Sequence, residues 1–395
     1  MIKRDLNLQG IGAKKTPALG IGMIGLGCIG EAHLDGILRM PYIFSNPPAK
    51  PVLVTACDLR KEKTVEVSER FGFKNCTSDW KDLLKNESIQ VVYNTAPNNM
   101  HLEPCIAAAE AGKHIVCEKP LGRDSKESKA IFKAAREAKI KHICNFIFRM
   151  TPALAFAKKM LDEKKLGKII SFSATRLIDH LLDPDSPFTW RLDKKISGSG
   201  VVGDLMSHII DLARWLCGEP VSVQAVNKVF IKKRPRVEDK TLKSTVLVED
   251  DALAILDFKN GATGYLAASG MRAGRKAVAE IEINGELGTI YWNFEEINKL
   301  QVYFNNKDMP QLCGFNNIDI SGNVFPYIDK WYYPLARLGF LDLFMHTAYN
   351  IAGAVVNDTD PATSSATFED GYKASVICDA ILKSSETGKK ESISY

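Results

Sequence analysis

Residues 1–150 alternate between short apolar runs and segments with helical periodicity. The apolar runs at 19–25, 51–57, 89–94, 114–117 and 142–147 predict five buried strands. Helices are predicted between them over 31–38, 61–71, 103–111 and 125–138, with another beginning near residue 78. Strands that alternate with helices form a parallel, doubly wound sheet, and the loops after the carboxyl ends of its strands hold ligands. We therefore expect an α/β nucleotide-binding domain over 1–150.

The pattern changes over residues 151–395. After a predicted helix at 151–166, strand-like runs follow one another at 168–175, 221–229, 245–248, 252–258, 263–269, 277–284, 289–293 and 301–304. Asn260-Gly261 between two of them is a strong hairpin signal. These runs predict an α+β domain with a large, open, mostly antiparallel sheet. A loop-rich stretch at 308–340 and a last helix at 367–383, able to return to the first domain, complete it.

The helix predicted between residues 203 and 217 carries charge on an apolar background. Four Leu and Ile side chains recur there at helical spacing, and Gly218 ends the helix. Asp204 and His208 share another face, one turn apart, followed by Asp211. Burying an acid and an imidazole is costly unless something pairs or uses them. The helix alone fits a capped core histidine as well as a functional pair.

Composition excludes several classes of function. A net charge of +5 over 395 residues does not indicate nucleic acid or an anionic membrane surface. No run approaches the ~18 apolar residues of a membrane span, and the first residues lack the pattern of a signal peptide. Nine scattered cysteines without a Cys-x-x-Cys pair indicate reduced thiols in a cytoplasm. Seven histidines without His-Glu-x-x-His predict no metal site.

The motif Gly25-x-Gly27-x-x-Gly30, with Cys28 and Ile29 inside it, joins the first strand to the first helix. This arrangement lets backbone and helix N-terminus approach a pyrophosphate. Asp58 ends the second strand, where a carboxylate binds ribose hydroxyls and repels a 2′-phosphate. Arg60 could still tolerate that phosphate, so NAD is favoured and NADP remains possible. We attribute the long spacing between Gly30 and Asp58 to a proline-containing loop at 39–50.

Three more motifs establish a resemblance: Thr95-Ala96-Pro97-Asn98…His101, Glu118-Lys119-Pro120 and Gly203-Asp204-x-x-x-His208-x-x-Asp211. With the glycine motif they resemble the glucose–fructose oxidoreductase / inositol dehydrogenase / MocA (Gfo/Idh/MocA) family, over about residues 19–388. The resemblance implies a Rossmann domain joined to an open antiparallel sheet, a homodimer or homotetramer formed through that sheet, and oxidation of a secondary hydroxyl of a sugar or cyclitol. Within the family, 188–200 and 274–276 are similar to levoglucosan dehydrogenases and related glycoside 3-dehydrogenases. Met206-Ser207 departs from the small pair frequent before the family's histidine.

The resemblance also implies roles. Lys119 would stabilise the developing alkoxide, His208 would act as general base, and Asp204 would orient His208 or bind a neighbouring hydroxyl, while hydride passes to the nicotinamide without a metal. The dinucleotide would contact Gly25, Gly27, Cys28, Ile29, Gly30, Asp58, Arg60, Thr95, Ala96, Pro97, Asn98, His101, Glu118, Lys119 and Pro120. Substrate contacts are expected from Arg149, Arg176, His180, Trp190 and Arg191, for which structural pairing is an equal alternative. A redox-neutral NAD-dependent glycosidase and a cofactor-binding sensor remain alternatives.

Overall fold

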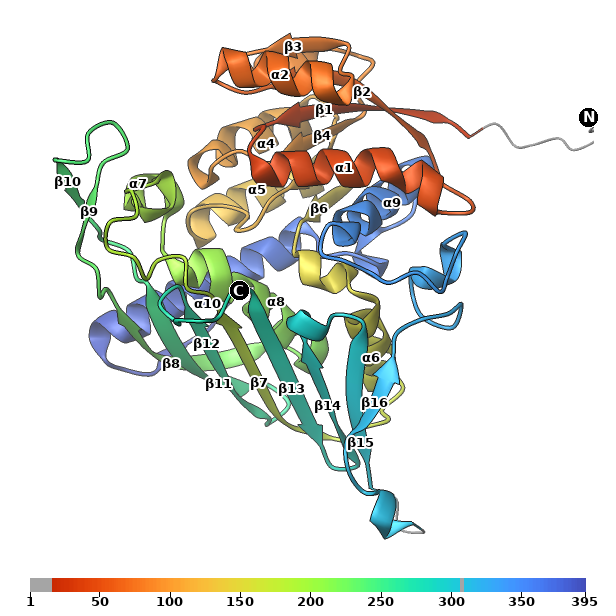
Figure 1. The fold of residues 1–395 in the computed structure, drawn as a ribbon, viewed down its shortest axis with the longest axis vertical. Coiled ribbons are helices and arrows are strands. Elements are labelled where there is room, and N and C mark those ends of the chain that lie inside the picture. The colour runs from red at the N-terminus through yellow and green to blue at the C-terminus, as the bar shows by residue number, and fades with distance from the viewer. Residues whose placement is uncertain (1–15, 306–308) are drawn as a thin grey trace, which may run out of the picture.

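The computed structural model describes residues 16–305 and 309–395, arranged as two sheets with helices between and around them (Figure 1). The residues on which the expected lack of a signal peptide rests lie outside these ranges, as does Asp308. The first sheet lies at the top of Figure 1 and the second at the bottom.

The first sheet has six strands in the order β3-β2-β1-β4-β5-β6, all paired in parallel. Its strands are β1 (Ala18–Ile24), β2 (Lys50–Cys57), β3 (Asn75–Thr77), β4 (Val91–Asn94), β5 (His114–Cys117) and β6 (His142–Cys144). Its helices are α1 (Cys28–Ile43), α2 (Lys61–Phe71), α3 (Lys81–Lys85), α4 (Leu102–Glu110) and α5 (Ser125–Glu137). The doubly wound fold is confirmed. Strand β3 escaped prediction because it is three residues long and has no apolar run.

The loop predicted at 39–50 is wrong in its first part, because helix α1 continues to Ile43 and contains Pro41. A proline so near the helix end removes one hydrogen bond and leaves the preceding turns intact. The longer helix, with the short segment after it, accounts for the spacing between Gly30 and Asp58. Gly36 lets α1 approach α9 (Asp342–Val356) closely, since a Cβ there would lie 2.6 Å from the backbone N of Met345.

The second sheet has nine strands in the order β16-β15-β14-β13-β7-β12-β11-β8-β17, and its only parallel pair among the described residues is β12 with β7. The strands are β7 (Ile169–Leu177), β8 (Pro220–Lys228), β11 (Asp251–Phe258), β12 (Thr263–Ser269), β13 (Val278–Gly285), β14 (Gly288–Asn293), β15 (Lys299–Phe304), β16 (Asn316–Asp319) and β17 (Glu391–Ser392). The open, mostly antiparallel sheet is confirmed.

The strand predicted at 245–248 is wrong. Only Thr245 belongs to a strand, β10 (Lys243–Thr245), which pairs with β9 (Lys233–Pro235) in a separate hairpin that projects at the left of Figure 1. Val246 and Val248 lie outside any strand and pack with Leu192 in a small buried cluster. Because buried loop residues are apolar, this part of the sequence resembles a strand. Strands β16 and β17 were not predicted.

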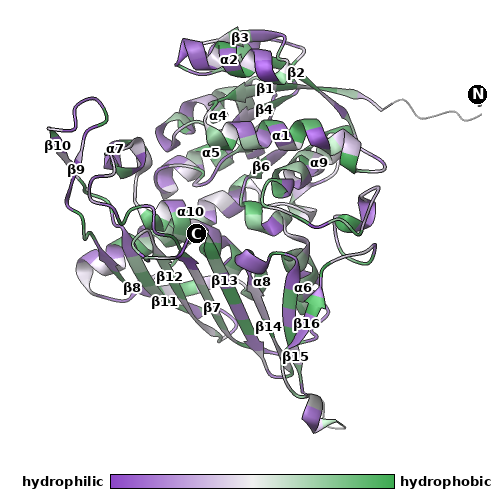
Figure 2. Ribbon diagram, in the orientation of Figure 1, coloured by the Kyte–Doolittle hydropathy of each residue, from purple (hydrophilic) through white to green (hydrophobic). Residues whose placement is uncertain are grey.

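Helices cover one face of the large sheet. Helices α6 (Pro152–Asp162), α8 (Ser207–Cys217) and α10 (Phe368–Thr387) pack against β14, β7 and β8 respectively, and α10 also packs on α5 of the upper sheet. Apolar and polar residues alternate along the lower strands (Figure 2). The other face leaves Val226, Leu253, Ile255 and Tyr265 exposed.

Across residues 16–305 and 309–395, we find no helix with the length and hydropathy of a membrane span. Nor do the same ranges contain a group of three or more His, Cys, Asp or Glu side chains arranged to hold a metal ion.

Candidate active site

A cavity of about 720 Å³ lies at the carboxyl ends of the parallel strands, facing the second domain. One end, here called the glycine-loop end, is formed by the segments that follow β1, β2 and β4. The other, the lysine end, contains Lys119, Arg176, Arg191, Asp204 and His208. The cavity therefore joins loops of the first sheet to side chains of the second domain, as expected for an α/β sheet that binds ligand.

The three motif glycines have different functions at the glycine-loop end. Gly25 has φ +87°, and a Cβ there would lie 2.6 Å from the backbone N of Ala96. A Cβ at Gly30 would lie 2.4 Å from the Gly25 carbonyl oxygen, whereas one at Gly27 would meet no atom within 4 Å. Gly25 and Gly30 thus permit close packing, and Gly27 keeps the start of α1 open to the cavity. This geometry fits a dinucleotide pyrophosphate.

Asp58 lies in the cavity wall directly after β2. Its Oδ2 accepts a hydrogen bond from the Leu26 N–H at 2.9 Å, and its Oδ1 accepts one from Arg60 Nε at 3.0 Å. Burial raises the pKa of the Asp58 carboxyl, but the hydrogen bonds from Arg60 and Leu26 outweigh it and lower the pKa overall. An ionised carboxylate with this placement suits ribose hydroxyls.

The segment after β4 connects the two domains. Thr95, Ala96, Pro97 and Asn98 line the cavity, and Asn98 Nδ2 donates to the Ser197 carbonyl at 2.8 Å. His101 is fully buried, with Nδ1 3.0 Å from the Pro120 carbonyl oxygen and Nε2 3.0 Å from that of Ala96. The structure places Gly30, His101 and Pro120 behind the lining, where they hold its loops in place.

Glu118 is almost wholly buried beside the lysine end. Its Oε1 lies 2.9 Å from His33 Nε2 and accepts a hydrogen bond from Asn145 Nδ2 at 2.6 Å. Burial raises the pKa of Glu118, but its hydrogen bonds and the charges of His33 and Lys119 lower it overall. Glu118 is thereby fixed against the segment that follows β6.

Lys119 joins the two domains through Asp204. Its Nζ donates to the Asp204 carbonyl oxygen at 2.7 Å and to Oδ1 at 2.9 Å. Asp204 does not belong to the predicted α-helix: Val202–Met206 forms a π-helical turn, closed by the Ser207 N–H on the Val202 carbonyl, and α8 begins only at Ser207. Such turns often occur at functional sites because they change which backbone groups are available.

His208 opens onto the cavity and is otherwise enclosed by aromatic rings. Its ring centroid lies 4.9 Å from that of Phe148 and 6.3 Å from that of Phe146. Nδ1 is buried and has no hydrogen-bond partner among the described residues. Burial lowers the pKa of His208 far below its usual range, and the positive charges of Lys119 and Arg176 lower it further. His208 is therefore neutral at pH 7 and able to accept a proton.

The Asp204 carboxylate is directed to cations rather than to His208. Besides Lys119, Arg191 Nε lies 3.7 Å from Asp204 Oδ2. Burial raises the pKa of Asp204, but the charges of Lys119 and Arg191 hold it well below its usual range. Among the described residues, no hydrogen bond links Asp204 to His208. The geometry thus favours contact with a ligand over orientation of the imidazole.

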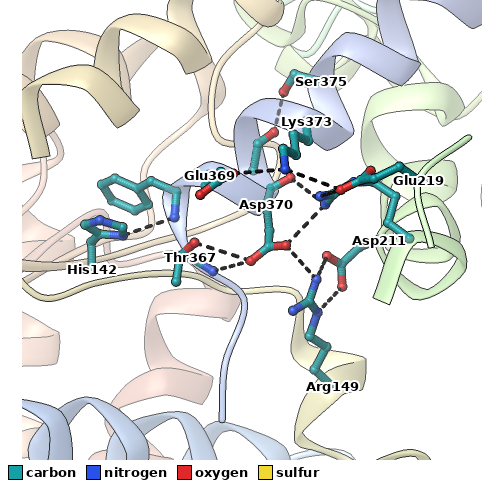
Figure 3. A network of polar contacts seen from close by, with 12 residues as sticks. His142, Arg149, Asp211, Glu219, Thr367, Glu369, Asp370, Lys373 and Ser375 are labelled. Carbon is teal, nitrogen blue, oxygen red and sulfur yellow. Dashed lines mark hydrogen bonds and ion pairs between the residues drawn. The ribbon is translucent and has the colours of Figure 1, made fainter. Parts of the chain in front are cut away.

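The five residues expected to contact substrate separate into two groups. Arg176, Trp190 and Arg191 line the cavity, but His180 and Arg149 do not. Arg149 donates to Asp211 from Nε at 2.8 Å and from Nη2 at 2.6 Å, and Nη2 also reaches Asp370 Oδ1 at 3.0 Å (Figure 3). Its charge is therefore paired with two carboxylates away from the cavity.

Several lining residues were not predicted. Asn145 and Ile147 follow β6, so the rule that ligands bind after strand ends could have found them. Trp80 was not predicted because it follows β3, a strand that was itself not predicted. Phe340 and Phe344 lie far along the chain, at and just before α9, and give no local signal. Ser197 ends the short helix α7 (Lys194–Ser197), and Ser199 follows it in a Gly/Ser-rich stretch.

The fold and the cavity define a two-domain oxidoreductase with a dinucleotide-binding Rossmann domain. Residues 19–146 match the family model for the oxidoreductase family with an NAD-binding Rossmann fold, and residues 154–291 match the model for the GFO/IDH/MocA C-terminal domain. The chain belongs to the Gfo/Idh/MocA oxidoreductase family.

Its relatives include levoglucosan dehydrogenase of Pseudarthrobacter phenanthrenivorans, 38% identical over 93% of this chain and 96% of that protein. Myo-inositol 2-dehydrogenase of Thermotoga maritima is 27% identical over 69% and 74%. A levoglucosan dehydrogenase structure in complex with NADH and L-sorbose aligns with a TM-score of 0.91 at 38% identity, covering 95% of this chain and 99% of that one. An oxidoreductase domain protein from Kribbella flavida also gives 0.91, at 33% identity over 96% and 100%.

Proposed function

We propose that this protein is an NAD(P)-dependent dehydrogenase that oxidises a secondary hydroxyl of a sugar, glycoside or cyclitol to a ketone. One observation carries the proposal: Lys119, Asp204 and neutral His208 lie at one end of a cavity whose other end fits a dinucleotide. Relatives named for levoglucosan and inositol oxidation support the choice of substrate class.

Each residue then has a distinct role. Lys119 Nζ donates to the reacting hydroxyl and stabilises negative charge on its oxygen as the proton leaves. His208 accepts that proton, and Asp204 holds Lys119 and binds an adjacent hydroxyl. A bound nicotinamide would supply the acceptor for the carbon-bound hydrogen and its electron pair. The alcohol thus loses hydride and proton to two different acceptors, and a ketone remains.

The cofactor preference follows from Asp58. An ionised carboxylate at the end of β2 favours NAD over NADP, because a 2′-phosphate would be repelled there. We assign cofactor binding to residues 1–150, and substrate binding and oligomerisation to 151–395.

The reaction is tested by absorbance at 340 nm with NAD or NADP and a panel of levoglucosan, myo-inositol, scyllo-inositol, glucose and simple glucosides. We expect NADH formation with at least one member, slowed by orders of magnitude in Lys119→Ala and His208→Ala. Cleavage of a glycoside without net NADH would instead identify the redox-neutral glycosidase. Tight NAD binding with no chemistry on any member, or on the carboxylated counterparts of these sugars, would identify a sensor.

We further propose a homodimer or homotetramer formed through the exposed face of the large sheet. Leu253 and Ile255 on β11, Val226 on β8 and Tyr265 on β12 are each about half exposed and neighbours across the strand pairs. Contiguous apolar side chains on an open sheet are typical of an interface between copies. Light scattering after size-exclusion chromatography should show an oligomer for the parent and monomer for Leu253→Asp/Ile255→Lys. A parent monomer would refute the proposal.

We place the protein in a reducing cytoplasm. Cys57, Cys105, Cys117, Cys144, Cys217 and Cys378 are buried as thiols without disulfides. Buried thiols of this kind are typical of proteins in reducing compartments.

A further inference from the structure

The lysine end of the cavity has more positive than negative charge. Lys119 pairs with one oxygen of Asp204, and Arg191 approaches the other oxygen of the same carboxylate. Glu118, also in the lining, is bound to His33 and Asn145 on the side of the first sheet. Arg176 remains, with no carboxylate in contact among the described residues.

Arg176 lies on β7, between β12 and β13. Its guanidinium has five N–H donors. Among the described residues only Nη1 has an acceptor, the Val278 carbonyl at 3.1 Å, and Nε is buried with none. The Arg176 side chain as a whole is half-buried in the cavity wall. An arginine that is largely removed from water is normally paired with an anion, because an uncompensated charge is costly there. Burial accordingly lowers the pKa of Arg176, and only the more distant Asp204 opposes this shift.

Arg176 lies near the proposed proton acceptor, His208, with Phe148 packed against both. Its guanidinium carbon lies 5.7 Å from the ring centroid of Phe148, and Phe148 in turn packs on His208. Arg176 is therefore on the side of the cavity that holds the proton acceptor. Another cation of the cavity lining, Arg191, is held over the Trp190 ring at 4.5 Å.

We propose that the substrate is a carboxylated sugar, such as a uronic acid or its glycoside, and that Arg176 binds the carboxylate. The inference rests on the proposed function, since it names the substrate class of that site. Sugar hydroxyls could occupy the free N–H donors, but only an anion would also compensate the charge. A monoanion matches the single unpaired guanidinium. The carboxylate takes no part in the redox step and is unchanged by it.

The test compares ligands that differ only at C6: methyl glucopyranosiduronate, its uncharged carboxamide and methyl glucopyranoside, with the same three compounds in the galacto series. Turnover is followed by NADH absorbance. Binding of each compound to the NADH-loaded protein is followed by calorimetry, which needs no reaction. We expect the acid to exceed its amide by about tenfold or more in kcat/KM or in affinity, as for loss of a charged hydrogen bond.

Variants assign the preference to Arg176. Arg176→Gln should abolish the acid-to-amide ratio, and Arg176→Lys should retain part of it. Arg337→Gln, which removes an equal charge from an exposed pair with Asp319, should leave the ratio unchanged. Equal or better use of the neutral compounds by the parent, or an unchanged ratio in Arg176→Gln, would overturn the inference. Methyl glucopyranoside 6-phosphate is tested as well. If the protein prefers this phosphate to the acid, the inference of a carboxylated substrate is also overturned.

These experiments distinguish failure of the carboxylated-substrate inference from failure of the proposed dehydrogenase function. Oxidation of neutral sugars alone would refute the carboxylated substrate and support the dehydrogenase. Arg176-dependent binding of the acid with no NADH formed from any compound would support the substrate class and refute the reaction. No binding preference and no turnover would refute both.

Discussion

Two charged clusters are anchored on the same helical segment, by aspartates seven residues apart, and differ in how fully their cations are paired. The cavity cluster consists of Lys119, Arg176, Arg191 and Asp204, in which Lys119 and Arg191 share one carboxylate and Arg176 contacts none among the described residues. The buried network, drawn in Figure 3, contains Arg149, Arg214, Asp211, Asp370 and Glu219. Asp204 anchors the first from the π-helical turn, and Asp211 anchors the second from α8.

The buried network leaves neither of its arginines unpaired. Arg149 and Arg214 each contact two carboxylates, and the pairing links α8 to α10 and to the segment after β6. Its central side chains are nearly inaccessible, with Arg149 6%, Arg214 4% and Asp211 1% exposed, whereas Asp370 and Glu219 at its edge are 21% and 33% exposed. In the cavity cluster, Lys119 and Asp204 are 14% and 33% exposed, and Arg176 has no carboxylate in contact among the described residues. The comparison teaches that a cluster whose cations are all paired orders helices, whereas a cluster with an unpaired cation beside a cavity indicates a ligand.

The largest expected effect on rate comes from Lys119→Ala. Loss of the donor that stabilises the developing alkoxide should lower kcat by about 10²–10³-fold. Because the pair with Asp204 is partly solvated, the free energy of unfolding should change by only about 1 kcal/mol or less. Steady-state kinetics and urea unfolding measure the two effects. Lys299→Ala, which removes an exposed partner of Glu296, is the control; a similar kcat loss there would contradict a specific role.

Arg149→Met should show the opposite behaviour. Removing this cation leaves Asp211 buried without its partner, which should lower the free energy of unfolding by about 3–5 kcal/mol. The double variant Arg149→Met/Asp211→Leu should recover most of that stability, since Asp370 keeps Arg214. Thermal unfolding of the three proteins measures this. If the double variant is less stable than the single one, the network does more than balance charge.

Asp58→Ala tests a carboxylate of intermediate exposure. It removes the acceptor at the end of β2, so the preference for NAD over NADP should fall about tenfold, as for a lost hydrogen bond to a charged group. Release of Arg60 should favour NADP further. Dissociation constants for both cofactors, measured by fluorescence titration, give the ratio. An unchanged ratio would show that another residue selects the cofactor.

The sequence predicts the parts of the site that local signals determine. Gly25, Asp58, Thr95 and Lys119 follow strand ends in a regular βα pattern, so their convergence follows from the topology. The π-helical turn was not predictable, because apolar spacing over 203–217 fits an uninterrupted helix. The partners of Arg149 were not predictable either, since Asp370 is 221 residues away and nothing local distinguishes a cavity arginine from one in a buried ion pair.

The smallest expected effect is on the pH dependence of the rate. The pKa of His208 is lowered in the folded protein, so His208 should stay neutral from pH 8 to 6.5. The value of kcat/KM should fall only below pH 6.5, because a protonated imidazole can no longer accept a proton; this fall is the acid limb of the pH profile.

Arg176→Gln should move the acid limb upward toward pH 6.5. Burial and the charge of Lys119 still lower the pKa of His208 in this variant, but the charge of Arg176 no longer does. The pH profiles of the parent and this variant, measured with a neutral substrate, compare the two. Since Arg149 is absent from the groups that shift His208, Arg149→Lys should leave the limb in place. An equal shift in both variants would show that the limb reports general loosening rather than the charge of the cavity cluster.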